Sequence, residues 1–111
     1  MAGVVLVPWY ATFFRGDQLE RALEEIAPIA LRYGALDYEV IRSQQDTYKF
    51  MHFSAWESKD DFEAYWHGTE FKRWRADHSS WYQVLIMPEW NDRITRDEAG
   101  RMQQPVEGDP A

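Results

Sequence analysis

The sequence predicts one α+β domain with the element order β-α-β-β-α-β, the split βαβ arrangement of ferredoxin-like proteins. Segments rich in β-branched and aromatic residues open and close the first 90 residues, two more lie together in the middle, and segments of helical periodicity separate them. We expect a four-stranded antiparallel sheet with two helices on one face. The domain should span residues 1–90, and residues 91–111 should form a polar tail that is flexible or wraps around a partner.

The first strand is expected over residues 3–14, which are apolar on both alternating faces, as in a central strand covered on two sides. Asp17 with Glu20 three residues later has the spacing of a helix-capping box, so a helix should start there. Pro28 should kink the last turns of this helix, and Gly34 should end it.

The second and third strands are expected over residues 36–42 and 47–56, because the short polar loop between them suits an antiparallel hairpin. Ser58 with Asp61 is a second capping signal, and Gly68 interrupts the helical pattern that follows. We therefore expect a helix in two pieces. Residues 81–90 should form the last strand.

Composition limits the kind of partner. The 111 residues carry a formal net charge of −7, whereas nucleic acid and anionic membrane surfaces need clustered Lys and Arg. No apolar stretch approaches the roughly 20 residues of a membrane-spanning helix. The chain has no Cys, which excludes disulfides, thiolate metal ligands and a Cys nucleophile. We expect a cytoplasmic protein that binds neither nucleic acid nor membrane.

The aromatic content predicts a partner of another kind. Six Trp residues and 16% aromatic residues supply more apolar surface than a monomer of this size buries easily. Because the first strand is apolar on both faces, the sheet face without helices also needs a cover. We expect a homodimer in which two sheets meet face to face as a dimeric α/β barrel. Its cavity should bind a small apolar or aromatic metabolite.

The third strand and the helix after it carry a family resemblance. The strand runs into Trp56-Glu57-Ser58-Lys59-Asp60-Asp61-Phe62, and Tyr65 and the helix break precede Glu70-Phe71-Lys72. This arrangement resembles the antibiotic biosynthesis monooxygenase superfamily of dimeric α+β barrels over residues 3–90. Members of that group include cofactor-free oxygenases acting on quinols and polyketides, haem-degrading enzymes and proteins of unknown role. The fold does not choose among these functions.

The haem-degrading branch resembles the chain through the same helix and uses an Asn, a Trp and a His in its pocket. Those positions fall on Trp9, Tyr65 and Arg75, and none of the three matches. Without the His, no axial haem ligand stands where the resemblance places it. Haem degradation is therefore the less favoured activity, and no cofactor is expected.

His52 of the third strand is the first expected catalytic residue. By period-2 alternation it shares a face with Phe50 and Trp56, and we expect this face, with Trp9, to bind substrate in the cavity between the sheets. A polar ring among aromatics suits a ligand held by stacking and one hydrogen bond. An imidazole is also the best placed acid or base. The alternative is a His hydrogen-bonded within the core.

The broken helix supplies the other candidates, because an interrupted helix often leaves a gap over the sheet. Tyr65 occupies the position of a pocket Trp in the resembling haem enzymes, so we expect a catalytic hydroxyl there. Trp66, Arg75 and His78 are expected to bind substrate, with core packing for the Trp and a solvated position for the Arg as the simpler alternatives. No metal site is expected.

Three functions follow from these observations. The leading hypothesis is a cofactor-independent monooxygenase that deprotonates an aromatic, quinol or polyketide-like metabolite, whose anion then reduces oxygen, with His52 as base and Tyr65, Trp9 and Arg75 as orienting groups. The alternative is a module that binds a metabolite without turning it over. The third is a structural dimer whose cavity is filled by its own side chains.

Overall fold

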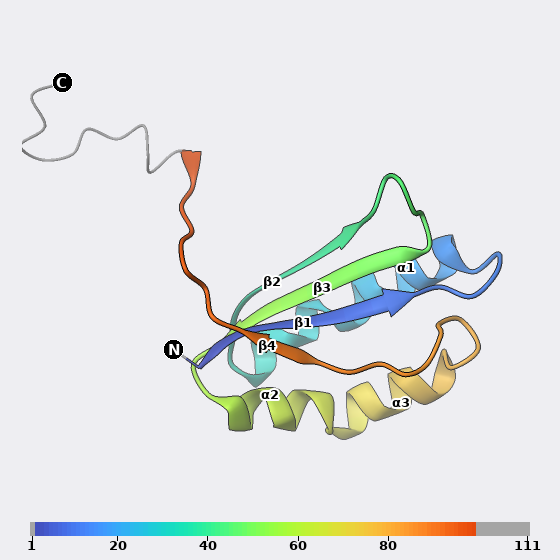
Figure 1. Cartoon of the computed structure of the whole chain (residues 1–111). Coiled ribbons are helices and arrows are strands. Elements are labelled where there is room, and N and C mark those ends of the chain that lie inside the picture. Colours follow the sequence, from blue (N-terminus) through green and yellow to red (C-terminus); the bar gives the residue numbers. More distant parts are fainter. Residues whose placement is uncertain (1, 100–111) are drawn as a thin grey trace, which may run out of the picture.

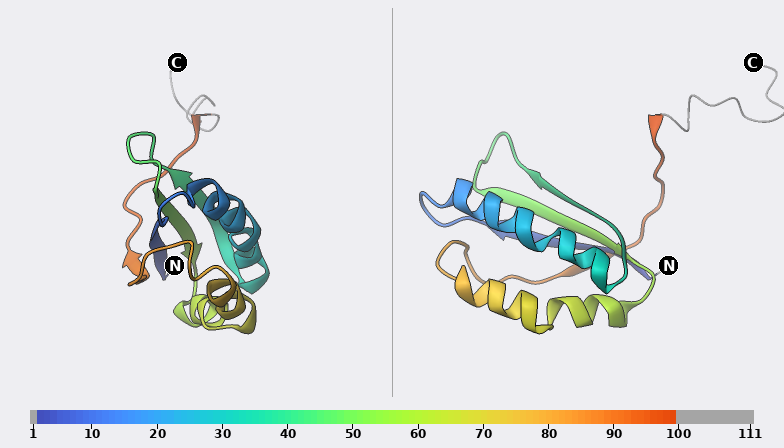
Figure 2. Two further views of the ribbon diagram at one scale, coloured as in Figure 1. Left: turned by 90° about the vertical axis from the view of Figure 1, so that its right-hand side faces the viewer. Right: turned by 180° about the vertical axis from the view of Figure 1, so that it is seen from behind.

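The computed structural model describes residues 2–99. Its elements are β1 (Gly3–Tyr10), α1 (Gly16–Ile26), the 3-10 helix η1 (Pro28–Tyr33), β2 (Ala35–Arg42), β3 (Lys49–Trp56), α2 (Lys59–Trp66), α3 (Thr69–Asp77) and β4 (Glu89–Asn91) (Figure 1). The strands form one antiparallel sheet in the order β2-β3-β1-β4. All helices lie on one face of it (Figure 2). The predicted α+β, ferredoxin-like fold is confirmed.

β1 is a central strand, as expected, although it ends at Tyr10 rather than at residue 14. Val5, Val7 and Trp9 are buried against the helices, and the residues between them are half-buried on the opposite face. The strand therefore contributes to two apolar surfaces, of which the helices cover only one.

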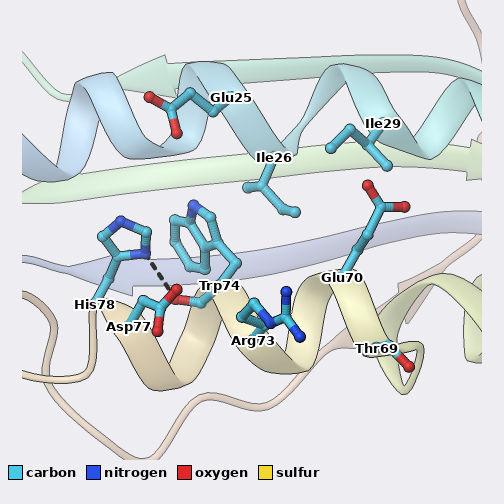
Figure 3. A pocket seen from close by; sticks show the side chains of 9 residues that line it. All are labelled: Glu25, Ile26, Ile29, Thr69, Glu70, Arg73, Trp74, Asp77 and His78. Carbon is cyan, nitrogen blue, oxygen red and sulfur yellow. Dashed lines mark hydrogen bonds between the residues drawn. The ribbon is translucent and has the colours of Figure 1, made fainter.

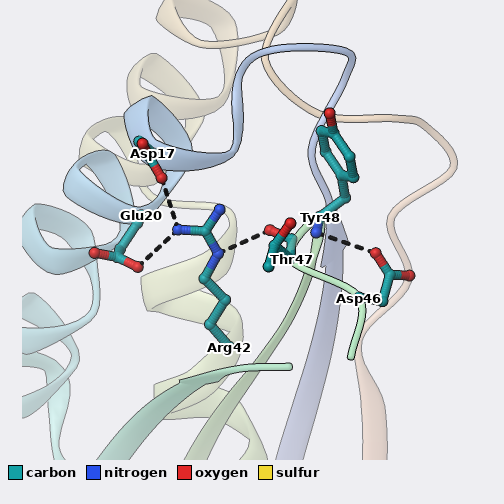
Figure 4. A network of polar contacts seen from close by, with 6 residues as sticks. All are labelled: Asp17, Glu20, Arg42, Asp46, Thr47 and Tyr48. Carbon is teal, nitrogen blue, oxygen red and sulfur yellow. Dashed lines mark hydrogen bonds and ion pairs between the residues drawn. The ribbon is translucent and has the colours of Figure 1, made fainter. Parts of the chain in front are cut away.

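The first helix begins one residue earlier than predicted, and its acidic residues have another role. No side chain caps α1. Instead, Asp17 and Glu20 accept hydrogen bonds from Arg42 Nη1 at 2.9 and 3.1 Å, and Arg42 Nε donates to the carbonyl of Thr47 at 2.7 Å (Figure 4). Gly16 makes room, because a Cβ there would lie 2.5 Å from Arg42. This network joins the start of α1 to the β2–β3 hairpin.

The other predicted helix boundaries hold with small changes. Pro28 does not kink α1 but begins η1, and Gly34 ends η1 with φ at 106°, in the left-handed region that favours glycine. Ser58 caps α2 by accepting a hydrogen bond from the backbone N–H of Asp60. The break at Gly68 separates α2 from α3, which confirms the helix in two pieces.

The last strand is much shorter than the predicted residues 81–90. Only Glu89–Asn91 pair with β1, and Tyr82 forms an isolated bridge with Ala11. In the segment between Tyr82 and β4, Val84 and Leu85 are about 80% exposed. This apolar run has strand composition, but it does not continue the ladder that β4 makes with Val4–Leu6.

His52 lies on the helix-covered face of the sheet, between Val7 of β1 and Val40 of β2. The expectation that its face lines the cavity between two sheets is therefore wrong. Period-2 alternation says which residues share a face, not which face the helices cover. The uncovered face carries Leu6, Pro8 and Tyr10 of β1 with Met51 and Phe53 of β3.

No helix within residues 2–99 is long and apolar enough to cross a membrane. The expected C-terminal tail is described only as far as residue 99, and residues 92–98 form no helix or strand. The rest of that prediction falls on residues outside the described part of the chain.

Candidate functional site

The candidate site is centred on His52, a polar residue only 2% exposed in an aromatic environment. Its Nδ1 lies 3.4 Å from the indole Nε1 of Trp9, which donates a long hydrogen bond to it. Its Nε2 is buried without a partner among the described residues. Burial lowers the pKa of His52 to about 4, because the charged ring would lose its hydration, so the imidazole is neutral at ordinary pH.

Aromatic rings from both helices of the break surround Trp9. The ring centroid of Trp9 lies 5.1–6.3 Å from those of Trp66, Phe71, Trp74 and Tyr82. The ring centroids of His52 and Phe71 are 6.5 Å apart. We call these residues the aromatic cluster: Trp9, His52, Trp66, Phe71, Trp74 and Tyr82. The cluster occupies the space between the centre of the sheet and the α2–α3 break, and it brings together two predicted site residues that are 43 positions apart with a third, Trp66.

Arg75 borders the aromatic cluster and is not the solvated surface residue of the simpler alternative. Its guanidinium carbon lies 4.0 Å from the ring centroid of Trp66 and 4.9 Å from that of Phe71. Its Nη1, like Nε2 of His52, is buried and has no hydrogen-bond partner within residues 2–99. Burial lowers the pKa of Arg75, but an arginine keeps its charge in proteins. The cluster therefore has a cation at its edge.

Tyr65 is buried, but its hydroxyl is already bonded. It donates to the backbone carbonyl of Ile26 at 2.6 Å, and its ring contacts Phe71 at 4.8 Å. Burial raises its pKa above the ordinary value for a tyrosine. In this arrangement Tyr65 joins α2 to the end of α1, and a direct catalytic role, which stays a prediction, requires that bond to open.

Phe50 and Trp56 share the buried face of β3 with His52 but lie toward opposite ends of it. Phe50 packs beneath the guanidinium of Arg42 at 5.0 Å. Trp56 donates from Nε1 to Ser54 Oγ at 2.8 Å, and its ring lies 5.6 Å from that of Phe62. Both predicted substrate contacts therefore have packing partners of their own, and their roles in binding stay predictions.

His78 lies outside the aromatic cluster, in a surface groove of about 290 Å³ between α1–η1 and α3 (Figure 3). Its Nδ1 contacts the carbonyl of Trp74 at 2.7 Å. The apolar side of this helix groove is formed by Ile26, Ile29 and Trp74. Trp74 also contacts Trp9, the hydrogen-bond partner of His52. The indole of Trp74 therefore lies between the helix groove and Trp9.

Charged residues rim the helix groove, but the described residues offer no metal centre. Among residues 2–99, no group of three or more His, Asp or Glu side chains is placed to hold a metal ion. Glu70 is bonded to Arg32 at 2.9 Å and to Tyr33 at 3.1 Å. What the aromatic cluster offers instead is a neutral imidazole among polarisable rings, with a guanidinium over two of them.

Three members of the cluster were not predicted as site residues. Phe71 and Trp74 continue the apolar spacing of α2 into α3, which predicts core packing only. Tyr82 follows α3, and its hydroxyl donates to the carbonyl of Arg75 at 2.9 Å. The spacing of Phe71 and Trp74 could have placed them beside Trp66. Nothing in the sequence places Tyr82 there.

A protein-family model described as antibiotic biosynthesis monooxygenase matches residues 15–77. The match runs from the loop before α1 to the end of α3 and includes His52, Trp66 and Arg75. Trp9 and His78 lie outside it. No curated protein shows a significant sequence match to the chain.

Solved structures share the fold over most of the chain. PA3566 from Pseudomonas aeruginosa has a TM-score of 0.72 at 18% identity, over 86% of this chain and 97% of its own. SnoaB, a cofactor-independent oxygenase from Streptomyces nogalater, has a TM-score of 0.72 at 14% identity, over 88% and 100%. A conserved protein of unknown function from Bacteroides thetaiotaomicron has a TM-score of 0.67 at 13% identity, over 82% and 100%. These identities show a common fold alone.

Proposed function

Because the chain belongs to the antibiotic biosynthesis monooxygenase family, we propose that it oxidises a small aromatic, quinol or polyketide-like metabolite with molecular oxygen and without a bound cofactor. One observation carries the proposal: a neutral imidazole with an unpartnered nitrogen is buried in a cluster of aromatic rings, two of which, Trp66 and Phe71, contact a guanidinium. A buried polar atom without a partner is uncommon in a purely structural core. Cofactor independence is the description of SnoaB, which has the same fold.

The reaction class needs no reductant from outside. An electron-rich phenol loses its proton, and the resulting anion passes electrons to oxygen. A carbon–oxygen bond then forms, and the hydroperoxide loses water to give a quinone. One oxygen atom enters the product and the other leaves as water, so the substrate supplies all of the electrons. The protein has to bind the ring, favour the anion and keep the reacting carbon open to oxygen.

The residues of the aromatic cluster divide these tasks in the proposal. Trp66 and Phe71 contact the substrate ring in place of part of the edge-to-face contact that they make with each other, with centroids 4.8 Å apart. His52 meets the substrate oxygen, and Arg75, which lies over the rings of Trp66 and Phe71, orients the substrate. Tyr65 holds the α2–α3 break against α1 through Ile26 and so positions the rings.

We further propose that the chain acts as a homodimer in which the two uncovered sheet faces meet. Tyr10 and Ile41 leave 38% and 40% of their surface exposed on that face. Leu6, Met51 and Phe53 are half-buried beside them. An apolar face of this extent is typical of a subunit interface.

The function is tested by oxygen uptake. Protein treated with a chelator is mixed with anthrone or 1,4-dihydroxynaphthalene, and oxygen and product are followed against the uncatalysed rate. We expect one molecule of oxygen to be consumed per molecule of substrate. The rate of oxygen uptake should fall about 10²-fold or more in His52→Phe. His67→Gln, which changes an exposed residue of the helix break paired with Glu63, is the matched control and should keep the activity.

The second candidate is a binding or structural module without turnover. The observation that favours it is the contact between the rings of the cluster, in which Trp9 is completely buried. It predicts no oxygen uptake above background with any of these substrates. That result with a correctly folded protein would contradict the proposed oxidation.

A further inference from the structure

We propose that the uncovered sheet faces of two copies of this chain meet with opposite ends together, so that one end of each face fills a pocket at the other end of the second copy's face. The partner for this surface is therefore a second copy of the chain. The inference rests on the homodimer of the proposed function and adds the arrangement of its two subunits.

The segment after β4 crosses one end of the uncovered face. It leaves β4 at Asn91 and runs on the side of the sheet away from the helices (Figure 1 and Figure 2). Arg93 Nη1 pairs with Asp37 Oδ2 at 3.4 Å. Asp37 belongs to β2, the edge strand opposite β4. The segment of residues 92–96 is therefore tied across the width of the sheet at this end.

A pocket of about 750 Å³ lies between this segment and the sheet. Its floor is apolar: Val4 lies in the cross-strand row of Asp37, and Leu6 and Phe53 pair in the next row on this face. Ile94 lines the pocket from the segment and is 88% exposed. This end of the face, which we call the hollow end, thus has apolar surface on two sides of an open space.

The other end of the face, which we call the open end, carries side chains that lie outside this pocket. Pro8, Met51 and Ile41 form its first cross-strand row, and Tyr10 pairs with Lys49 in the next. Tyr10 and Ile41 are 38% and 40% exposed. The open end therefore presents partly exposed apolar side chains.

The hollow end fits the open end and does not fit a second hollow end. Stacked sheets lie about 10 Å apart, with the side chains of the two inner faces interdigitated. Two hollow ends would bring both copies of the 92–96 segment into the same space. With opposite ends together, Tyr10 and Ile41 of the second copy enter the pocket over Leu6 and Phe53, and the twofold axis repeats the contact. The pocket is then filled by protein rather than by a metabolite.

Charge favours the same arrangement. Glu39 and Glu89 lie in the second row of the hollow end, and Lys49 lies in the last row of the open end. The cations of the segment pair with other acids: Arg93 with Asp37, and Arg96 with Glu98. Opposite ends together bring Lys49 of each copy toward the carboxylates of the other. Two hollow ends would set Glu39 and Glu89 of both copies against each other, and like charges that face across an interface weaken association.

Thiol cross-linking reports which ends meet, because the chain has no Cys of its own. Val4→Cys marks the hollow end and Tyr10→Cys the open end, roughly 20 Å apart along β1. Tagged Val4→Cys protein and untagged Tyr10→Cys protein are co-expressed as full chains, and a short bis-maleimide is added. Since each chain holds one thiol, every covalent pair joins two chains.

We expect the tagged–untagged pair to be the main covalent product, with little product from two tagged or two untagged chains. Like pairs as the main product would show that the same ends meet and would overturn the inference. The absence of covalent pairs in protein that sedimentation velocity shows to be dimeric would overturn it as well.

A charge reversal tests the arrangement without thiols. Lys49→Glu should raise the dissociation constant of the dimer about 10-fold or more, because it sets a carboxylate against Glu39 and Glu89 of the second copy. Sedimentation at several protein concentrations gives this constant. Lys72→Glu, which changes an exposed lysine of α3, is the matched control and should leave the constant unchanged. Equal constants for Lys49→Glu and the wild type would contradict the arrangement.

This inference and the proposed function fail separately. A dimer with cross-links between like ends would remove the arrangement and leave the proposed homodimer. A wild-type monomer would remove both. Neither result depends on whether oxygen is consumed.

Discussion

The phenolic oxygen of Tyr65 lies 2.6 Å from the backbone carbonyl oxygen of Ile26, a buried hydrogen bond that joins α2 to the last residue of α1. The carbonyl at this position is close to a helix end, where it lacks a partner further along α1. The contact holds the helix break over the sheet.

Tyr65→Phe should destabilise the protein by about 1–3 kcal/mol, because it leaves a buried carbonyl without its donor. The free energy of unfolding is measured in urea. Tyr33→Phe removes a hydroxyl that contacts Glu70 at the surface and should cost less than about 0.5 kcal/mol. Equal stabilities of the two variants would contradict the structural role of Tyr65.

His52 should make the stability of the fold depend on pH between about 4 and 6.5. Its folded-state pKa is lowered from 6.5 to about 4, so the unfolded chain takes up the proton first as the pH falls. The contribution is fully present above pH 6.5 and declines toward pH 4, by about 3 kcal/mol in total for a shift of this size.

Urea unfolding of the wild type and of His52→Phe at several pH values separates the contribution of His52 to the pH dependence of stability from the contribution of the carboxylates. In His52→Phe, the free energy of unfolding should lose the part of its pH dependence that falls between about pH 4 and pH 6.5. His67→Gln, at the surface beside Glu63, should retain the wild-type slope. The same pH dependence of stability in the wild type and in His52→Phe would mean that folding does not lower the pKa of His52.

Arg42→Met should cost about 1–2 kcal/mol, because it removes the bonds to Asp17, Glu20 and the Thr47 carbonyl at a half-buried position. Gly16→Ala should destabilise the wild type by displacing the guanidinium, and it should be better tolerated when Arg42 is already Met. A double-mutant cycle measures this coupling, which should be about 0.5–1 kcal/mol. Additive effects would show that Arg42 can move aside freely.

Phe53→Glu should convert the proposed dimer to a monomer, because it places a charge at the uncovered sheet face opposite Leu6 and Glu39. Sedimentation velocity gives the size of the protein. Leu31→Glu, a 50% exposed position on η1 and away from that face, should leave the dimer intact. A wild-type monomer, or a dimeric Phe53→Glu protein, would contradict the interface.

The element order was predictable because each boundary has a local signal. Gly34 ends η1 with a positive φ, Ser58 caps α2, and Gly68 separates two helices whose apolar spacing continues across the break. The last strand was overestimated because Val84 and Leu85 have strand composition, yet the register against β1 differs by two residues between the Ala11–Tyr82 bridge and the ladder of β4, and the residues between these points do not pair. Composition does not report the register of a strand.

The candidate site was predictable only in part. Period-2 alternation grouped His52 with Phe50 and Trp56, but the side on which α2 and α3 pack is a tertiary outcome. The hydrogen bond between Trp9 and His52 joins residues 43 positions apart. Arginine is a residue type found mostly at the surface. Only the packing of Trp66 and Phe71 brings the guanidinium of Arg75 into the protein.

The central claim is that the space around His52 receives a ligand and is not merely a filled core. The most direct test is a titration with 1,4-dihydroxynaphthalene under argon, which prevents turnover, followed through the indole N–H resonances of the six Trp residues. We predict saturable shifts of Trp9 and Trp66, with Trp81 and Trp90 unchanged. Shifts of Trp74 alone would place the ligand in the helix groove, and no shift of Trp9 or Trp66 at saturating ligand would contradict the claim.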